Sequence, residues 1–598
     1  MLAATTVLAQ DGASVYKARC AVCHDSPTGR VPGSNALRTM SSAFILQSLN
    51  AGLMQTLAAG MNSRERTAVA SYLGSKTPPL AASLPASAFC PAQKPQPTKE
   101  LASVTWMGWG SDVENTRFAN SDLAGLNAAD VPNLKLLWAF SLGDGTSVRS
   151  QPAVADRQVY AANLTGQVFS LDSRTGCIHW TFVGSNPVRS AIVVGPSVHA
   201  PKRNAVYFGD QGANVYSLDA LTGKLLWQVH ASDHFAAMIT GAPILHAGVL
   251  YVPTSSLEEL LATSAAYECC TFRGSVLALD AATGKRIWKT DTIAGPTLPT
   301  VKNKSGTQLR GPSGAAVWSA PTFDEQRNVI YVATGDNYSE PATAMSDAVL
   351  CLDAATGNLL WSKQLTSDDV YNMGAEASGR DYDFGQPPIL VTLAHGKREL
   401  VIGQKSGLVY ALDPDRSGEL LWQQRLGEGG PLGGIQWGSA TDGQNMYVAY
   451  SHLLIKPVSD PSAFMGSRFE LDPKRGGGLF GLRLDSGKTV WKAEPASCGD
   501  RKQCSPAQSA AVTAIPGVVF SGSEDGHLRA YSTSTGEVIW DMDTAHEFKT
   551  ANGLAGRGGS LDASGPVISQ GILYVNSGYG QWGGMPGNVL LAFSIHGK

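Results

Sequence analysis

Two cysteines and a histidine near the start of the chain, in the stretch CAVCH, have the spacing that covalent haem attachment requires. In a C-x-x-C-H motif the two thiols bond a c-type haem and the histidine binds its iron. Cys20 and Cys23 are therefore predicted to carry the haem, and His24 is the expected proximal ligand. A zinc or redox site built on C-x-x-C is the alternative, but the histidine that follows at once favours haem.

The haem needs a second axial ligand, and a methionine thioether in this place raises the reduction potential. Met40, Met54 and Met61 are the candidates. We favour Met54, because it precedes the last predicted helix, where the cytochrome c pattern usually has its methionine, and Met61 is the alternative. Helical patterns in SVYKARC and SRERTAVASYLG, on either side of the motif, predict an all-α domain resembling a small cytochrome c over residues 1–77.

The stretch YECCTFRGS sets Cys269 directly beside Cys270. Consecutive Cα atoms lie about 3.8 Å apart, whereas ordinary disulfides span roughly 4.4–6.8 Å, so a bridge here would strain the peptide between them. Either the thiols stay apart or the strain serves a purpose. Elsewhere, Cys498 and Cys504 can close a small loop, which fits an oxidising compartment, and Cys351 in VLCLD is expected to be a buried free thiol.

Beyond residue 100 one pattern recurs, as in YSLDALTGKLLW and LALDAATGKRIW. Each copy reads as an alternating strand, a tight turn with Thr-Gly or Ser-Gly, and a second strand that ends in tryptophan. Strand-only repeats of this length predict an all-β eight-bladed β-propeller over residues 101–598, with the repeated tryptophans packed between blades. These tryptophans are Trp138, Trp180, Trp227, Trp288, Trp361, Trp422, Trp491 and Trp540.

The two ends of the repeat region complement each other. NLKLLWAF supplies only the strand that bears Trp138, and the C-terminal GNVLLAFSI supplies a matching strand with no tryptophan after it. Pairing the two would complete the eighth blade and remove an exposed sheet edge. Before the repeats, residues 78–100 are rich in proline and small residues without periodicity, which indicates a linker.

Composition excludes several partner classes. The chain has 46 basic and 49 acidic residues and a net charge of −3, which gives no signal for nucleic acid or an anionic membrane. No apolar run reaches the roughly eighteen residues that span a bilayer. The start, MLAATTVLAQDG, resembles the stub of a trimmed export signal, so we expect a periplasmic or secreted protein.

The repeated Asp-x-x-Thr-Gly-x-x-x-Trp unit is the tryptophan-docking motif of the quinoprotein alcohol dehydrogenases, and residues 101–598 resemble that family throughout. The resemblance implies pyrroloquinoline quinone (PQQ) as cofactor with a Ca²⁺ ion beside it. Trp318 in GAAVWSAP resembles the tryptophan beneath the quinone, since a planar cofactor needs a flat face to stack on. Related repeats also occur in propellers without catalysis, so a haem-tagged scaffold is the alternative function.

Two segments resemble the family's calcium ligands. ATGDN resembles a short turn whose asparagine binds the ion; here Asp336 takes that place and Asn337 follows it. VPTSSLEELLA resembles the stretch that supplies a carboxylate, and its spacing favours Glu259, with Glu258 as the alternative. Carboxylate and amide oxygens suit a hard cation such as Ca²⁺.

GRDYDFGQPPIL resembles the strand that carries the family's catalytic aspartate. Matching Pro388 and Leu390 places that base at Asp381. Asp383 stands where lanthanide-dependent relatives have an extra metal ligand, so the choice of base and of metal stays open between the two aspartates. Lys405 in IGQKSGLVYALD resembles the lysine that contacts the quinone oxygens.

Weaker resemblances add further candidates to the cofactor site. A threonine and a tryptophan in a glycine-rich turn match residues that contact the cofactor, and two arginines can each bind one of its carboxylates through two hydrogen bonds. A glutamine and a tryptophan in GGIQWGS complete the set. These candidates are Thr240, Trp582, Arg149, Arg189, Gln436 and Trp437.

The resemblance implies alcohol oxidation in which PQQ carries the redox chemistry, with electrons passed singly to the haem and then to an external cytochrome. Here the cytochrome precedes the propeller, as in the cytochrome-bearing polyvinyl alcohol dehydrogenases. That order favours secondary alcohols on a polymer or bulky polyol, with small alcohols as the alternative.

Some members of the family carry a vicinal disulfide against the quinone plane, and CCTFRG resembles it. We therefore expect Cys269 and Cys270 to form a bridge over the quinone. In the methanol-oxidising members, however, the pair precedes the metal-binding glutamate in the chain, whereas here it follows Glu259.

Overall fold

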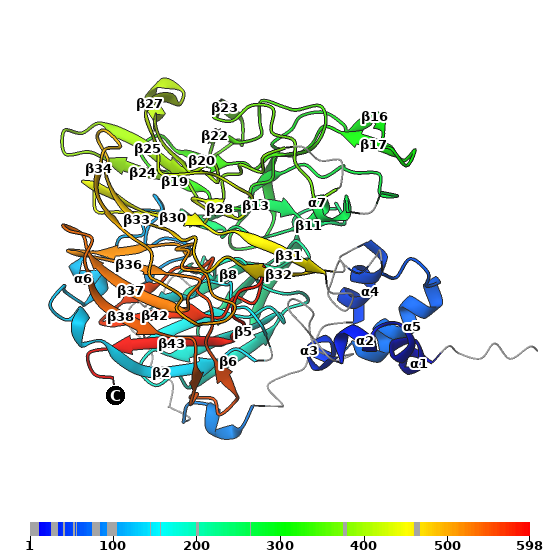
Figure 1. The fold of residues 1–598 in the computed structure, drawn as a ribbon, viewed down its shortest axis with the longest axis horizontal. Helices are drawn as coiled ribbons and strands as arrows, with labels where there is room; N and C mark the ends of the chain where they lie inside the picture. Colours follow the sequence, from blue (N-terminus) through cyan, green and yellow to red (C-terminus); the bar gives the residue numbers. More distant parts are fainter. Residues whose placement is uncertain are drawn as a thin grey trace, which may run out of the picture.

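In the computed structural model, a group of short N-terminal helices lies beside a large ring of β-sheets (Figure 1). The structure describes residues 11–25, 34–39, 42–51, 54, 57–74, 84–91, 104–143, 145–155, 157–198, 203–263, 265–374, 379–459 and 467–597. The predicted fold class, an eight-bladed propeller after a small helical domain, is confirmed.

The described part of the N-terminal domain consists of helices around one apolar core. They are α1 (Gly12–Arg19), α2 (Ala21–His24), α3 (Ser34–Thr39), α4 (Ser42–Ala51) and α5 (Ser63–Leu73). A capping box begins α5, because Asn62 and Glu65 each accept a hydrogen bond from the other's backbone N–H. Gly12 lets α1 cross α5 closely, since a Cβ there would lie 2.2 Å from the Ala68 carbonyl oxygen.

Eight antiparallel sheets form the blades. Blade 1 contains β1 (Val104–Trp106), β3 (Ala153–Ala155), β4 (Gln158–Ala162), β5 (Gln167–Asp172) and β6 (Ile178–Val183), and blade 2 contains β7 (Val193–Pro196), β8 (Asn204–Gly209), β9 (Asn214–Asp219) and β10 (Leu225–His230). Blade 3 contains β11 (Ala237–Met238), β12 (Ile244–His246), β13 (Val249–Ser256), β14 (Ser275–Asp280) and β15 (Arg286–Asp291). Blade 4 contains β19 (Thr322–Asp324), β20 (Val329–Ala333), β22 (Ala348–Asp353) and β23 (Leu359–Gln364). Blade 5 contains β24 (Ile389–Thr392), β25 (Arg398–Gly403), β26 (Leu408–Asp413) and β27 (Glu419–Arg425), and blade 6 contains β28 (Gly433–Gly434), β29 (Ala440–Thr441), β30 (Asn445–His452), β33 (Gly477–Arg483) and β34 (Thr489–Ala493). Blade 7 contains β35 (Thr513–Ile515), β36 (Val518–Gly522), β37 (His527–Ser532) and β38 (Val538–Asp543). Blade 8 contains β41 (Val567–Ser569), β42 (Ile572–Ser577), β43 (Val589–Ser594) and β2 (Lys135–Ser141).

Short elements connect or extend the blades. They are α6 (Ser121–Ala124), α7 (Glu258–Leu261), η2 (Ala86–Ala88), η3 (Val131–Asn133), η4 (Pro414–Arg416), β16 (Leu298–Lys302), β17 (Gln308–Gly311), β18 (Ser313–Gly314), β21 (Asn337–Ser339), β31 (Ile455–Ser459), β32 (Ser467–Leu471), β39 (Glu547–Phe548) and β40 (Gly556–Arg557). The hairpin of β31 and β32 extends from blade 6 toward the N-terminal helices (Figure 1).

Seven of the eight repeated tryptophans pack on a left-handed glycine in the turn of the next blade. Trp227 of blade 2 illustrates the contact: its indole N–H donates to the Ala281 carbonyl at 2.9 Å. Its ring packs on Gly284, which has a φ of +71° and where a Cβ would lie 2.8 Å from the ring. Asp280 closes this turn by accepting hydrogen bonds from the Thr283 backbone and hydroxyl. The Asp-x-x-Thr-Gly turn therefore forms the surface on which the preceding blade packs.

The ring closes as the sequence predicts. Strand β2 pairs with β43, with Trp138 opposite Ala592, so the two ends of the propeller share the eighth blade. Trp540 of blade 7 then donates to the Leu134 carbonyl at 3.2 Å, just before β2. The pairing covers the edge of β43, and β2 becomes the outer strand of blade 8.

Three disulfides are present among the described residues. Cys498–Cys504 closes its loop as predicted, Cys269–Cys270 are bonded to each other, and Cys351 is a buried free thiol as expected. We did not predict the bridge between Cys90 and Cys177. The bridge attaches the predicted linker, residues 78–100, to the start of β6. There the Cys90 N–H also donates to the Ile178 carbonyl at 2.9 Å.

No helix in the described ranges is both long enough and apolar enough to cross a membrane.

We predict that Gly284→Ala destabilises the propeller more than Gly295→Ala. Both glycines have a left-handed φ, +71° and +77°, but no atom lies within 4 Å of a Cβ at Gly295. Left-handed backbone should cost each variant about 1–2 kcal/mol, and overlap with Trp227 should cost Gly284→Ala about 1–3 kcal/mol more. Urea unfolding followed by circular dichroism measures both, and equal losses would contradict the docking role of Gly284.

Candidate active site

A cavity of about 1020 Å³ lies at one end of the propeller and continues into the N-terminal domain. Its propeller wall is made largely by loops that precede the first strand of a blade or join the second and third strands, together with the end of β13 and the β31–β32 hairpin. Its other wall includes Cys20, Cys23, His24 and Met54. The haem motif and the centre of the propeller therefore share one cavity.

Three aspartates converge at the wall of this cavity. Carboxylate oxygens of Asp336, Asp381 and Asp383 all lie within 4.8 Å of one another. Asp336 follows β20, and the other two precede β24. The Lys405 ammonium, after β25, forms ion pairs with Asp381 and, at 3.4 Å, with Asp383. Such a set of close oxygens is typical of a hard-cation site.

The electrostatics of this acidic cluster are unfavourable without a cation. Burial and the neighbouring Asp383 raise the pKa of Glu259 to about 7, while Lys405 and Arg189 oppose the shift. Burial, Asp383 and Asp381 likewise raise the pKa of Asp336 well above its usual value. Burial alone would lower the pKa of Lys405, but the two aspartates raise it overall. One lysine thus stands among four carboxylates.

Two observations show that the cluster is preorganised but incomplete. Neither carboxylate oxygen of Asp336 has a hydrogen-bond partner among the described residues, although the side chain is only 1% exposed. Asp383, by contrast, accepts a hydrogen bond from the Asp336 backbone N–H at 2.6 Å. A buried carboxylate without a partner is costly unless a ligand satisfies it.

Asp369, which the sequence analysis missed, holds the loop that carries Asp381. Its carboxylate accepts backbone hydrogen bonds from Arg380 at 2.6 Å, Asp381 at 3.3 Å and Tyr382 at 2.9 Å. These bonds stabilise Asp381 at a φ of +55°. Asp369 lies in TSDDVYN, which carries no recognisable motif, so no sequence signal marked it.

Aromatic and cationic side chains adjoin the acidic cluster on the cavity wall. The Lys405 ammonium lies 5.7 Å from the centre of the Trp318 ring, and Trp437 packs edge-on against Trp318 at 5.5 Å. The guanidinium groups of Arg149 and Arg189 lie over Trp437 at 5.7 Å and 5.5 Å. The two indole N–H groups and the Nε of Arg149 are buried without a partner in the described structure, as expected of a pocket that takes a planar, anionic ligand.

The remaining weaker candidates also line the cavity. Thr240 shares a hydrogen bond of 2.6 Å with Ser255. Gln436 is buried beside Trp437, and Trp582 packs edge-on against Phe469 of β32 at 5.4 Å.

Glu258 and Asn337 occupy other positions than a cation ligand would need. Glu258 accepts hydrogen bonds from the Tyr267 hydroxyl at 2.6 Å and from the backbone of Thr271 and Phe272. The Asn337 amide donates to the Ser313 carbonyl at 2.9 Å, and its oxygen accepts from the backbone of Thr343. These local bonds use both side chains to hold loops, which leaves Glu259 and Asp336 as the candidates.

The vicinal disulfide is formed, as the sequence predicts. Cys269 and Cys270 are 4% and 0% exposed and belong to an apolar cluster with Ala316 and Tyr338. Those two neighbours line the cavity, whereas neither cysteine is part of its described wall. Backbone hydrogen bonds in both directions with Arg310 of β17 hold the pair behind the wall. Trp318 packs against the same apolar cluster, and the position of the bridge over the quinone stays a prediction.

At the haem end, His24 is buried and lines the cavity together with Met54. Met61 is buried in the core of the helical domain and does not reach the cavity wall. Met40 lies outside the described residues. Met54 thus stays the predicted ligand, with Met61 as the alternative.

Comparisons with known proteins agree with the fold. A family model described as "Glucose/ethanol/alcohol dehydrogenase, beta-propeller domain" matches residues 106–426, and one described as "Outer membrane protein assembly factor BamB" matches residues 474–596. A polyvinylalcohol dehydrogenase from Pseudomonas sp. is 40% identical over 98% of this chain and 94% of the relative. Another, from Sphingopyxis sp. strain 113P3, is 36% identical over 98% and 93%. The structure of quinohemoprotein alcohol dehydrogenase from Comamonas testosteroni has a TM-score of 0.62 at 21% identity, covering 82% of this chain and 81% of that one, which shows the shared fold.

We predict that Gly385→Ala weakens PQQ binding at least tenfold. A Cβ at Gly385 would lie 2.0 Å from Cη2 of Trp318 and 2.4 Å from the Gln436 carbonyl oxygen, so the indole must move. At Gly184 a Cβ would meet its nearest atom at 3.5 Å, so Gly184→Ala is the control. Titration of each apoprotein with PQQ, followed by tryptophan fluorescence, gives the affinities. Unchanged binding in Gly385→Ala would show that the cofactor does not depend on the Trp318 face.

Proposed function

Because this chain belongs to the PQQ-dependent alcohol dehydrogenases and matches two polyvinyl alcohol dehydrogenases over nearly its full length, we propose that it oxidises secondary alcohols of a polymer such as polyvinyl alcohol. In this proposal Ca²⁺ assists the reaction, and electrons pass through the N-terminal haem to an external cytochrome. The main observation in support of this proposal is the single cavity that the acidic cluster, Trp318 and the haem motif share.

The residues present fit both the metal and the quinone. Glu259, Asp336 and Asp383 are the proposed cation ligands, since they place hard oxygen donors in a buried site where carboxylates outnumber the Lys405 cation. Trp318 offers a flat face, and Arg149, near Trp437, offers an unpartnered donor for a carboxylate. A trivalent ion would satisfy the same oxygens, so the metal is identified by adding Ca²⁺ or a trivalent ion back to the metal-free protein.

Bound PQQ supplies the two-electron acceptor for the hydride equivalent that leaves the alcohol carbon. The chain's own contribution begins with Asp381, whose carboxylate we assign as the base that takes the hydroxyl proton. Asp369 orients the loop of Asp381, and the Lys405 ammonium favours its ionised form through their ion pair. Trp318 and Trp437 wall the site with apolar surface, which strengthens these electrostatic interactions by excluding water.

The haem side of the proposal rests on Cys20 and Cys23 as attachment points with His24 and Met54 as iron ligands. Val22, between the two cysteines, is 74% exposed. An apolar surface beside the haem supports contact with an external cytochrome. The three disulfides support a periplasmic or secreted location, because such bonds persist in oxidising compartments.

We predict that Asp381→Asn lowers turnover at least a hundredfold, because the general base is lost while side-chain size is kept. Asp368→Asn is the matched control, since Asp368 is also an aspartate with a left-handed φ but is exposed outside the cavity. Each holoenzyme, loaded with PQQ and Ca²⁺, is mixed with polyvinyl alcohol or a small secondary alcohol, and haem reduction is followed by its visible spectrum.

Equal loss in Asp381→Asn and Asp368→Asn would remove Asp381 from the proposed role. Reduction by small alcohols alone would reject the polymer as substrate but keep the dehydrogenase, and an unchanged haem spectrum in a folded, loaded wild type would reject electron transfer to the haem.

We predict that Met54→Leu abolishes the weak far-red band of a methionine-ligated ferric haem and lowers its reduction potential. Met61→Leu should keep the band, because that side chain packs in the core. Absorption spectra and redox titration of both variants test this, and the opposite pattern would assign Met61 as the ligand.

A further inference from the structure

A second group of buried acidic side chains lies between blades 7 and 8, outside the cavity wall. It centres on Glu524, in the turn that joins β36 and β37. This turn is the blade 7 counterpart of the blade 5 turn that carries Lys405. The two turns share one backbone hydrogen bond: the Gln404 N–H donates to the Leu408 carbonyl at 3.0 Å in blade 5, and the Ser523 N–H donates to the His527 carbonyl at 3.1 Å in blade 7. The repeat thus directs Lys405 into the cofactor cavity and places a carboxylate at the equivalent position of blade 7.

Glu524 is buried, and its side chain is 1% exposed. Neither carboxylate oxygen meets the geometry of a hydrogen bond with a described residue, although the side chains of Asp562 and Ser560 lie close enough to shift its pKa. Asp562, which precedes β41, is 5% exposed beside it. The neighbouring charges that act most strongly on Glu524 are those of Asp562 and Asp525, both acidic, and together with burial they raise its pKa well above the usual value. Uncompensated carboxylates of this kind are among the most expensive features of a protein interior.

Further oxygen atoms converge on the same place. At Gly584, the position of a Cβ would lie 2.4 Å from the Tyr579 carbonyl oxygen, 2.8 Å from Oε2 of Glu524 and 3.2 Å from Oγ of Ser560. The three oxygens therefore lie close to one another, and glycine lets the chain pass beside them without a side-chain collision. A carboxylate, a carbonyl and a hydroxyl in one place, with Asp562 beside them, form the ligand chemistry of a hard cation.

We propose that Glu524, Asp562, Ser560 and the Tyr579 carbonyl bind a second hard cation of the Ca²⁺ class. The bound ion offsets the charge of the two carboxylates and joins blade 7, which supplies Glu524, to blade 8, which supplies the others. This structural site is separate from the acidic cluster around Lys405 and does not depend on the proposed substrate or electron route.

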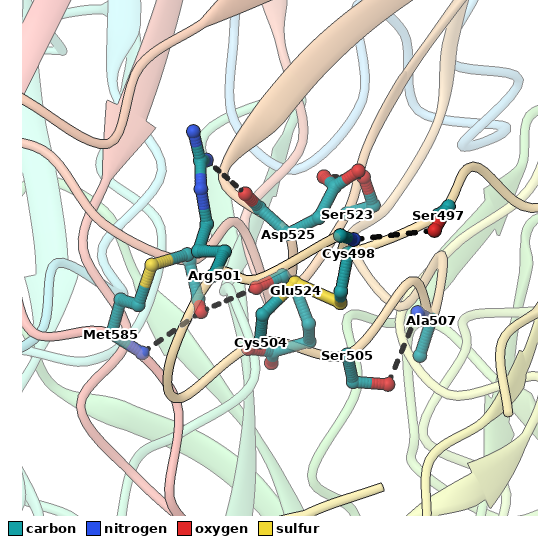
Figure 2. Close-up of a disulfide and its surroundings, with 12 residues drawn as sticks. Ser497, Cys498, Arg501, Cys504, Ser505, Ala507, Ser523, Glu524, Asp525 and Met585 are labelled. Carbon is teal, nitrogen blue, oxygen red and sulfur yellow. Dashed lines mark hydrogen bonds between the residues drawn. A yellow bond between two sulfur atoms is a disulfide. The ribbon is translucent and has the colours of Figure 1, made fainter. Parts of the chain in front are cut away.

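The site lies under the glycine-rich turn that brings Trp582 to the cofactor cavity. Ser560 already connects the two sides, because its hydroxyl donates to the Glu524 carbonyl at 2.8 Å and accepts from the Met585 backbone at 2.9 Å. On the other side, Arg501 of the Cys498–Cys504 loop donates to the Asp525 carbonyl at 2.6 Å, as Figure 2 shows. The cation therefore completes a set of contacts that positions the turn of Trp582.

The test is metal stoichiometry in the full-length holoenzyme. Wild type, Glu524→Gln and the control Glu537→Gln, an exposed glutamate of the same blade, are stripped with chelator, titrated with Ca²⁺ by calorimetry and analysed for bound metal. Wild type and Glu537→Gln should bind one Ca²⁺ per chain more than Glu524→Gln. Glutamine keeps the size of the side chain without its charge, so folding should persist. Asp562→Asn should show the same loss.

A second measurement does not depend on catalysis. Saturating Ca²⁺ should raise the Tm of wild type more than that of Glu524→Gln, because a ligand stabilises only the folded state that binds it. If the cation site around Asp383 failed to bind, wild type would take up one ion and Glu524→Gln none, which still supports the second site. Equal stoichiometry and equal Tm shifts in wild type and Glu524→Gln would overturn the proposal and leave Glu524 and Asp562 as a pair that shares a proton.

Discussion

The rest of the structure depends on the contact that seven of the eight repeated tryptophans make with a left-handed glycine of the next blade. The indole N–H binds a carbonyl of that blade, and the ring fills the space that the missing Cβ leaves open, as Trp227 does on Gly284. A directional hydrogen bond together with close packing determines both the spacing and the angle between blades. Repeated around the ring and closed by β2 against β43, the contact directs the inner loops of all blades toward one axis.

That convergence creates an electrostatic problem which determines the chemistry of the centre. Glu259, Asp336, Asp381 and Asp383 come from blades 3, 4 and 5, and Lys405 is the basic residue in ion-pair contact with two of them. The protein interior stabilises such a concentration of negative charge poorly unless a cation or protons compensate it. The same burial that makes the cluster costly makes it selective, because only a ligand with positive charge and several coordination positions satisfies all of these oxygens at once.

The repeated turn between the second and third strands shows how one backbone geometry serves different chemistry. In blade 5 it presents Lys405 beside Trp318, and in blade 7 it presents Glu524 beneath the turn of Trp582. The blade framework tolerates this exchange because the turn is held by its own backbone bonds. Side-chain identity at one position can then change without altering the packing of the strands.

The sequence by itself determined the architecture, because the spacing of Trp138 to Trp540, the Thr-Gly turns and the CAVCH motif are local patterns that read directly as blades and a haem domain. It also placed Trp318, Asp381 and Lys405 in one site through their resemblance to a known family. Only the tertiary structure decided that Glu258 and Asn337 hold loops, that Asp369 orients Asp381, that Cys90 pairs with Cys177, and that Cys269 and Cys270 pack with Ala316 and Tyr338. The physical reason is that the role of a polar side chain depends on which groups, often hundreds of residues away, the closed ring brings within hydrogen-bonding distance. No local pattern records those distances.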